Sequence, residues 1–301
     1  MQEHFGSRSL LLPPWLVLLR PKQWVKNVFV LPGPLFGHML LSWDSVGPIG
    51  GAFTMFCLLS SAVYVINDVL DVEEDRNHPE KRSRPIASKA ISQTAALILA
   101  GALIPVACAL AFWIGPQLGI VSLLYLANNL AYSLFLKTKI IADVLSIAIS
   151  FLLRILGGVV SVGLSPSSWL TMCGFCLALF LGFCKRRSEI GRMETGVFLG
   201  RTRAVLLVYT VEKLNLLCAI AASLTVMTYL LFTVSPETVA RHGTQALIYT
   251  APLVVYCVLR FLMKTLDLQG EDAGEVLLTD RGFVAAGLGW GLLAAGILYY
   301  Q

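Results

Sequence analysis

The sequence predicts an all-α protein that crosses a membrane several times, and three observations support this fold class. First, 56% of the 301 residues are hydrophobic and only 14% are charged, whereas soluble proteins contain about 25% charged residues. Second, no charged residue lies in 90–136, and only Asp143 and Arg154 lie in 140–184. Third, apolar runs of about 18 residues or more are typical of membrane-spanning helices. We expect nine such spans, near 24–42, 48–68, 92–113, 118–136, 140–161, 167–184, 213–233, 246–264 and 282–300.

Proline and glycine mark several borders between these spans. The first span is the weakest, because Pro32-Gly33-Pro34 interrupts it and proline removes a helical hydrogen bond. Gly115-Pro116 separates the third span from the fourth, and Gly163–Ser168 separates the fifth from the sixth. We expect one domain over residues 1–301, with residues 1–14 flexible.

The charges of the loops predict the orientation of the chain. Of 23 Lys and Arg residues, all but Arg154 and Arg241 fall at the N-terminus, in the loops after the even-numbered spans or at their edges. Positively charged loops stay in the cytoplasm, which places the N-terminus there. Of 18 acidic residues, only Asp44 and Glu237 lie in the opposite loops, and the positive-inside rule does not explain this. We therefore expect the cytoplasmic face to be the working face.

The end of the second span carries the first candidate site. If the helix continues beyond residue 68, residues three, four and seven apart share one face. Carboxylates on one face repel each other unless a cation lies among them, and hard oxygen ligands suit Mg²⁺, which commonly bridges carboxylates and substrate phosphates. The alternative is an acidic helix end that the basic residues Lys81, Arg82 and Arg84 neutralise. The polar residues on the predicted face are Tyr64, Asn67, Asp68, Asp71 and Asp75.

A second polar stripe follows the fifth span, where Asp143, Ser146, Ser150 and Arg154 have helical spacing. Arg154 lies deep in this span, and an arginine at that depth is expected to face a polar cavity or a partner. It either binds an anionic group that enters the membrane, such as a lipid phosphate, or pairs structurally with a carboxylate of a neighbouring helix.

Basic residues also gather at the ends of other spans. For any single group, topology signalling with a solvated face is a sufficient explanation. Together with the acidic motif, the groups predict a basin that binds phosphates. The sequence has no glycine-rich phosphate loop, nucleophile elbow or nucleic-acid-binding module. The basic groups are Arg20, Lys22 and Lys26, then Lys137 and Lys139, and finally Lys185, Arg186 and Arg187 beside Glu189.

Two segments, Asn67–Asp75 (NDVLDVEED) and Lys81–Ser88 (KRSRPIAS), resemble the first aspartate-rich motif of the UbiA-type intramembrane prenyltransferases. The resemblance implies transmembrane helices around a central cavity, and aspartates that hold Mg²⁺ on a diphosphate. One branch, the decaprenyl-phosphate phosphoribosyltransferases, is similar over most of the chain. The segments that carry this narrower resemblance are Arg20–Val30, Tyr132–Lys137, Leu152–Gly158, Lys185–Glu189 and Asp267–Arg281.

The sequence departs from the aromatic prenyltransferases of the superfamily at one place. Those enzymes carry a second aspartate-rich motif with two acids, whereas Asp143 here stands alone between Lys139 and Ile147. This weakens the case for a second metal site on a prenyl diphosphate and favours the phosphoribosyl branch.

The resemblance implies transfer of a 5-phosphoribosyl group from phosphoribosyl diphosphate to a polyprenyl phosphate, with Mg²⁺, for cell-wall arabinan precursors. It also implies a bacterial plasma membrane, an active site facing the cytoplasm, and a homo-oligomer worth testing. The alternatives are prenyl transfer to an aromatic acceptor and lipid transport, although transporters typically show paired broken helices that are not evident here. Asn67, Asp68, Asp71 and Asp75 would hold the metal, and the three aspartates would act with Lys185 in catalysis. Substrate contacts are expected from Lys22, Lys26, Tyr64, Arg82, Tyr132, Lys137, Asp143, Arg154, Arg186 and Glu189.

Overall fold

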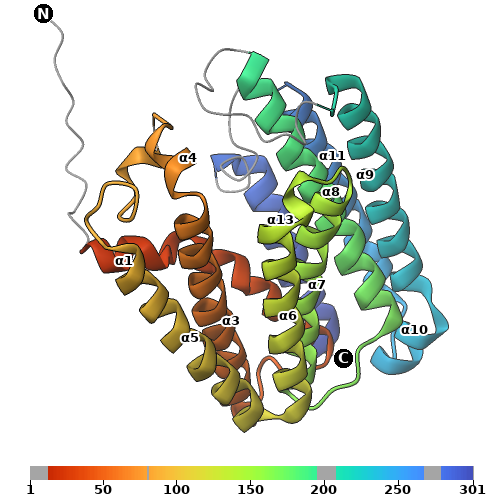
Figure 1. The fold of residues 1–301 in the computed structure, drawn as a ribbon. Helices are drawn as coiled ribbons and strands as arrows, with labels where there is room; N and C mark the ends of the chain where they lie inside the picture. Colours follow the sequence, from red (N-terminus) through yellow and green to blue (C-terminus); the bar gives the residue numbers. More distant parts are fainter. Residues whose placement is uncertain (1–12, 80, 195–207, 268–278, 301) are drawn as a thin grey trace, which may run out of the picture.

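The computed structural model describes residues 13–79, 81–194, 208–267 and 279–300. Within these ranges the chain forms helices and loops without a strand, which confirms the all-α prediction (Figure 1). The expected flexibility of the N-terminus and most of the acidic loop before the last span concern residues outside these ranges. The elements, with η for a 3-10 helix, are α1 (Pro14–Leu19), η1 (Pro21–Val30), α2 (Pro32–Phe36), α3 (Trp43–Leu70), α4 (Val72–Arg76), η2 (Lys81–Ser83), α5 (Gln93–Ile114), α6 (Pro116–Leu134), η3 (Leu136–Thr138), α7 (Ala142–Ser161), α8 (Ser168–Glu194), α9 (Val211–Val234), α10 (Pro236–His242), η5 (Ala246–Thr250), α11 (Ala251–Asp267) and α13 (Arg281–Tyr299).

Within the described ranges, seven helical segments are long and apolar enough to cross a membrane. The protein is therefore a multi-pass membrane protein. The seven segments coincide with the second, third and fifth to ninth predicted spans. They are Trp43–Leu70, Gln93–Ile114, Ala142–Ser161, Ser168–Gly191, Val211–Val234, Ala246–Asp267 and Arg281–Tyr299.

The other two predicted spans differ from these seven. The first is not one helix, because η1 ends at Val30 and the short α2 begins at Pro32. The fourth forms the helix α6, but Asn128 and Asn129 interrupt its apolar sequence. The total of nine spans and the orientation of the N-terminus therefore stay predictions.

Side-chain caps begin three of the long helices. Ser92, Thr210 and Asp280 each accept a hydrogen bond from the backbone N–H three residues further on, at the starts of α5, α9 and α13. Such caps satisfy N–H groups that a helix leaves unpaired. Gly115 ends α5 and Pro116 begins α6, as the sequence predicts.

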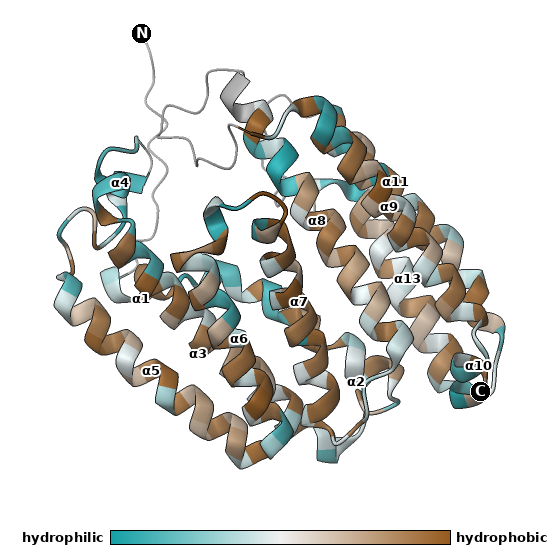
Figure 2. Ribbon diagram, turned by 45° about the vertical axis from the view of Figure 1, so that its right-hand side comes forward, coloured by the Kyte–Doolittle hydropathy of each residue, from teal (hydrophilic) through white to brown (hydrophobic). Residues whose placement is uncertain are grey.

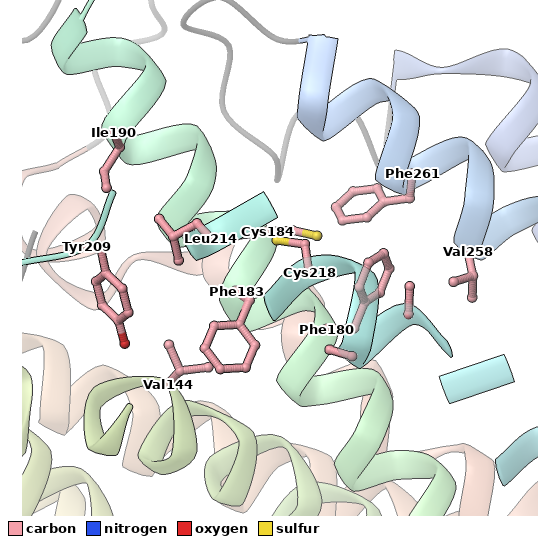
Figure 3. Packing of buried hydrophobic residues seen from close by; sticks show 12 residues of the cluster. Val144, Phe180, Phe183, Cys184, Ile190, Tyr209, Leu214, Cys218, Val258 and Phe261 are labelled. Carbon is pink, nitrogen blue, oxygen red and sulfur yellow. The ribbon is translucent and has the colours of Figure 1, made fainter. Parts of the chain in front are cut away.

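Helix α7 lies at the centre of the packing, since it contributes to two apolar cores. One core includes Val30 of η1 and Leu153 of α7. The other includes Val144 of α7 and Phe180 of α8, together with side chains of α9 and α11 (Figure 3). Gly158 lets η1 contact α7 directly, because a Cβ at this position would lie 1.8 Å from the carbonyl oxygen of Val30.

Polar residues gather toward the ends of the bundle, and apolar residues cover its sides (Figure 2). One end carries α4, together with η2 and η3, and is called the charged end below; α10 lies at the opposite end (Figure 1). Large apolar side chains are exposed along the sides, for example Trp113 (84%) and Leu292 (75%). Exposed apolar surface of this extent is expected where helices face lipid.

Candidate functional site

The helix that carries the acidic motif breaks at Asp71. Because α3 ends at Leu70 and α4 begins at Val72, the prediction of an uninterrupted helix is wrong at this residue. Helical hydrogen bonding nevertheless continues across the break. The N–H of Asp71 donates to the carbonyl of Asn67 (2.9 Å), and the N–H of Asp75 donates to the carbonyl of Asp71 (2.8 Å). The acids therefore keep the spacing of successive helical turns.

Two of these acids converge on one arginine. Asp68 and Asp75 are only 3% and 2% exposed. The Nη1 of Arg84 lies 3.0 Å from Oδ1 of Asp68 and 2.6 Å from Oδ2 of Asp75. Arg20, directly before η1, also forms an ion pair with Asp68. The guanidinium of Arg20 lies 5.0 Å from the ring centre of Tyr64, which attaches this predicted site residue to the same cluster.

Asp71 has a different partner. Its Oδ1 lies 2.8 Å from the Nζ of Lys137, in η3. In the part of the chain that the structure describes, no group of three or more His, Cys, Asp or Glu side chains is arranged to hold a metal. Asp68 and Asp75 thus share Arg84 as a partner, whereas Asp71 pairs with Lys137.

The pair of Asp68 and Asp75 has the chemistry of a magnesium site. Mg²⁺ is commonly bound by one or two carboxylates when substrate phosphates supply further oxygens. Both carboxylates direct an oxygen at one positive group, the shared nitrogen of Arg84. These residues fit a Mg²⁺ ion that binds together with a phosphate group, without a third protein carboxylate.

A second charged cluster surrounds Arg186 of α8, whose side chain is fully buried. Its Nε lies 2.7 Å from Oδ2 of Asp143 in α7, which is equally buried. Its Nη1 pairs with Glu189 one turn further along α8. Its Nη2 donates to the hydroxyl of Tyr132 in α6 (3.2 Å). Three predicted site residues, Tyr132, Asp143 and Glu189, thus contact the guanidinium of a fourth, Arg186.

Tyr209 belongs to this cluster and was not predicted. Its hydroxyl accepts a hydrogen bond from the N–H of Ile141 (2.7 Å) and donates to Oδ1 of Asp143 (3.3 Å). Figure 3 shows this hydroxyl directed toward the helix that carries Val144. Burial and the neighbouring carboxylate raise the pKa of Tyr209, so the hydroxyl remains a donor at neutral pH. Both oxygens of Asp143 are therefore engaged by protein groups.

The same hydrogen bond stabilises an unusual turn. Ile141 has a φ of +65°, a positive value that β-branched residues rarely adopt. Such a residue persists only where its surroundings hold it, and it often marks a functional site. No motif or spacing in the sequence connects Tyr209 with Ile141, which are 68 residues apart.

Arg154 is buried near the middle of α7 and bonds only neutral groups among the described residues. Its Nε donates to Oδ1 of Asn27 (2.8 Å), its Nη2 to the hydroxyl of Tyr125 (2.7 Å) and its Nη1 to the carbonyl of Ser150 (2.9 Å). Its guanidinium also lies 4.8 Å from the ring centre of Tyr125 and 5.4 Å from that of Phe151. The alternative of a structural pair with a carboxylate is therefore not found among the described residues, and binding of a lipid phosphate stays a prediction.

Replacing Arg154 by methionine is expected to lower the melting temperature of the purified protein. The substitution leaves Asn27 and Tyr125 with buried polar atoms that have lost their partner, which costs about 1–3 kcal/mol for each group. Thermal unfolding followed by intrinsic fluorescence measures the change. An unchanged melting temperature would show that the packing of α6, α7 and η1 does not depend on Arg154.

Three predicted basic residues are exposed at or near the charged end. Lys22, Arg82 and Lys185 have accessible side chains, and Lys185 directly precedes the buried Arg186. Arg82 was expected to reach the phosphates, whereas Arg84, two residues later, is the one that pairs with the aspartates. The ion pairs of Arg84 with Asp68 and Asp75 agree with the alternative of an acidic helix end that basic residues neutralise. The ion pair of Arg20 with Asp68 is the interaction that sequence analysis missed in this region.

An apolar pocket of about 270 Å³ lies between η1, α2, α8, α9, α11 and α13. The indole N–H of Trp290 donates to the hydroxyl of Tyr229 (2.7 Å), which also bonds the hydroxyl of Thr250 (2.5 Å). These polar atoms are thus satisfied within the protein, and the surface toward the pocket is hydrocarbon. The lining includes Phe29, Pro32, Leu177, Phe180, Val258 and Trp290.

An all-helical membrane bundle with buried ion clusters at one end and an apolar pocket among its spans has the architecture of an intramembrane transferase. Comparison with known sequences makes the class specific. The sequence model of the UbiA prenyltransferase family matches residues 30–279. The chain belongs to the UbiA prenyltransferase family.

Three curated relatives cover most of the chain, and all are decaprenyl-phosphate phosphoribosyltransferases. The protein of Mycolicibacterium smegmatis is 32% identical, over 98% of this chain and 95% of its own length. That of Corynebacterium glutamicum is 34% identical, over 90% of this chain and 82% of its own length. That of Mycobacterium tuberculosis strain H37Rv is 32% identical, over 90% of each chain. These relatives confirm the resemblance found in the sequence.

Solved structures confirm the fold. A UbiA homolog from Archaeoglobus fulgidus bound to GPP and Mg²⁺ superposes with a TM-score of 0.72 at 17% identity, covering 95% of this chain and 98% of its own. The same homolog bound to DMAPP and Mg²⁺ also gives a TM-score of 0.72, covering 96% and 100%. Structures of the family have thus been solved with Mg²⁺ bound.

Proposed function

We propose that this protein transfers a 5-phosphoribosyl group from phosphoribosyl diphosphate to a polyprenyl phosphate and releases diphosphate. The similarity to three phosphoribosyltransferases over nearly the whole chain supports this activity. The structural observation that carries the proposal over aromatic prenyl transfer is the ion pair of Asp143 with Arg186. Because Arg186 and Tyr209 occupy both oxygens of Asp143, the pair of Asp68 and Asp75 is the acidic cluster that remains for a metal diphosphate among the described residues.

The metal site of this proposal is formed by Asp68 and Asp75, with Asn67 and Asp71 as further predicted ligands. Bound Mg²⁺ would neutralise charge on the departing diphosphate. Lys185 lies exposed beside Arg186, and we assign it to the donor phosphates. The positive charge of Lys185 would stabilise the negative charge that develops on the leaving diphosphate.

The acceptor phosphate is placed by the remaining basic residues, Lys22 and Lys26, while the apolar pocket takes the first part of the polyprenyl tail. An oxygen of the acceptor phosphate forms the new bond to the anomeric carbon. The bond from that carbon to the diphosphate oxygen breaks, and diphosphate leaves with the electron pair. A phosphate oxygen is already ionised near neutral pH, so no side chain is needed as a general base. In-line attack inverts the anomeric carbon.

The same proposal places the protein in a bacterial plasma membrane, with the charged end in the cytoplasm where the soluble donor is available. Basic loops at that end support this orientation. We further propose that the chain acts as one catalytic domain. Size-exclusion chromatography with light scattering tests the expected homo-oligomer.

A transfer assay tests the function. The protein is reconstituted in lipid vesicles with Mg²⁺, polyprenyl phosphate and phosphoribosyl diphosphate labelled in the ribose, and the lipid phase is counted. Label should enter the lipid phase, and EDTA should abolish it. A parallel reaction with prenyl diphosphate and 4-hydroxybenzoate tests the aromatic alternative. Product in the second reaction alone would replace the proposal, and no product in either would return lipid transport to consideration.

Replacing Tyr209 by phenylalanine is expected to raise the KM for the donor about tenfold, while kcat changes less. The variant loses the hydrogen bond from Tyr209 that orients Asp143 and, through it, Arg186, and the loss of one hydrogen bond corresponds to a change of about this size. Steady-state kinetics over donor concentration measures both constants. Tyr299→Phe is the matched control, since the hydroxyl of Tyr299 likewise accepts from a backbone N–H, that of Leu40 (3.1 Å), near the opposite end. Equal changes in the two variants would reduce Tyr209 to a general structural role.

A further inference from the structure

The arginines at the acidic motif satisfy the atoms that a metal ion would use. Oδ1 of Asp68 is shared by Arg20 and Arg84, and Oδ2 of Asp75 is bound by Arg84. The two carboxylates are almost fully buried, whereas the side chains of Arg20 and Arg84 are 25% and 28% exposed. The arginines therefore cover the carboxylates from the more accessible side.

This arrangement creates a competition. Two carboxylates that share a buried site repel each other unless a cation lies between them. Here a guanidinium supplies that charge through short, charge-assisted hydrogen bonds. A divalent ion can bind the same oxygens only if at least one guanidinium gives them up, so a metal ion alone must overcome the loss of these bonds.

A diphosphate changes the balance. Mg²⁺ held by one or two carboxylates completes its coordination with phosphate oxygens. Those oxygens are good partners for arginine, whose planar fork matches phosphate. Arg20 is also held by the ring of Tyr64, so it stays near the site when it leaves Asp68. Each displaced guanidinium therefore has a new acceptor next to the one it lost.

We propose that Arg20 and Arg84 are exchange residues: they pass from the carboxylates of Asp68 and Asp75 to the phosphate oxygens of the donor when metal and diphosphate bind together. The inference rests on the metal diphosphate site of the proposed function, not on the identity of the group transferred. It makes binding of metal and binding of diphosphate cooperative, and by linkage each increases the affinity for the other equally.

Binding of Mn²⁺, used as a paramagnetic substitute for Mg²⁺, tests this exchange. The full chain in nanodiscs is titrated with Mn²⁺, and free ion is followed by electron paramagnetic resonance, with and without inorganic diphosphate. After correction for Mn²⁺ bound by diphosphate in solution, wild type should bind Mn²⁺ weakly alone and at least about tenfold more tightly with diphosphate.

Arg84→Gln should raise the affinity for Mn²⁺ alone and lower the gain in affinity that diphosphate gives. Mn²⁺ alone should bind about tenfold more tightly, because its competitor is gone, while the gain from diphosphate should shrink by a similar factor. Arg20→Gln should show the same signs and serves if Arg84→Gln does not fold. Arg76→Gln is the matched control, because Arg76 pairs with exposed Glu73 on α4 and not with the buried aspartates.

The proposal is overturned if both variants bind Mn²⁺ more weakly alone, since the arginines would then only support the fold of the site. It is also overturned if the gain from diphosphate equals that of wild type. Because no ribose or lipid is present, failure of the transfer assay leaves this result intact. Conversely, ribosyl transfer with normal coupling in Arg84→Gln would refute the exchange and retain the function.

Discussion

Asp68→Asn is expected to lower phosphoribosyl transfer by roughly two to three orders of magnitude in a protein that remains folded. The substitution keeps the size of the side chain and removes the charge that Arg20 and Arg84 share. A metal ion that loses one of its two carboxylates stabilises the leaving diphosphate less well. An increase of about 3–4 kcal/mol in the activation free energy corresponds to the expected loss of rate. The measurement is kcat at saturating Mg²⁺, with thermal unfolding of the same sample.

Two further variants make this result specific. Asp71→Asn is expected to have a smaller effect than Asp68→Asn, because Asp71 pairs with Lys137 and not with Arg84. Glu73→Gln should retain nearly full activity, since the side chain of Glu73 is 77% exposed. Normal turnover of Asp68→Asn would remove the metal assignment. Equal losses for Asp68→Asn and Asp71→Asn would show that Asp71 leaves Lys137 to join the metal.

Arg186→Met is expected to abolish activity and to destabilise the protein by about 3–5 kcal/mol. It leaves Asp143 as a buried charge without its partner, and the penalty for breaking one side of a buried ion pair is of this size. The melting temperature and the transfer rate are measured on the same preparation. A melting temperature equal to that of wild type would contradict the packing around Arg186.

A double variant separates the structural role of Arg186 from its role at the site. In Arg186→Met/Asp143→Asn the fully buried Asp143 no longer carries a charge, and Glu189, which also loses its ion pair with Arg186, is 25% exposed. Most of the lost stability should therefore return, because removing both partners of a buried pair is often nearly neutral. Activity should stay absent if Arg186 holds the donor phosphates. Recovery of activity together with stability would assign Arg186 to the fold alone.

Sequence alone predicted the features that depend on local spacing. Apolar runs gave the all-α membrane fold, and helical spacing selected Asp68 and Asp75, which the structure brings together. The i→i−4 bonding that continues through Asp71 is the physical reason that the spacing still held across the break.

Pairings between distant segments could not be derived in the same way. Helical spacing assigned Asp71 to the face of Asp68, but the position of η3 supplies Lys137 as its partner. A two-residue difference in the loop after α4 decides that Arg84 and not Arg82 reaches the aspartates. The contact of Tyr209 depends on the turn with positive φ at Ile141, and nothing in the local sequence predicts such a turn.

The apolar pocket among the spans has a consequence for how a lipid acceptor is selected. A tail that moves from the bilayer into this pocket exchanges one hydrocarbon surrounding for another, so almost no water is released and the usual hydrophobic gain is missing. The satisfied hydroxyls of Tyr229 and Thr250 add no polar attraction for it. The free energy of moving the tail from the bilayer into the pocket is then close to zero, so the protein must select the acceptor by its headgroup.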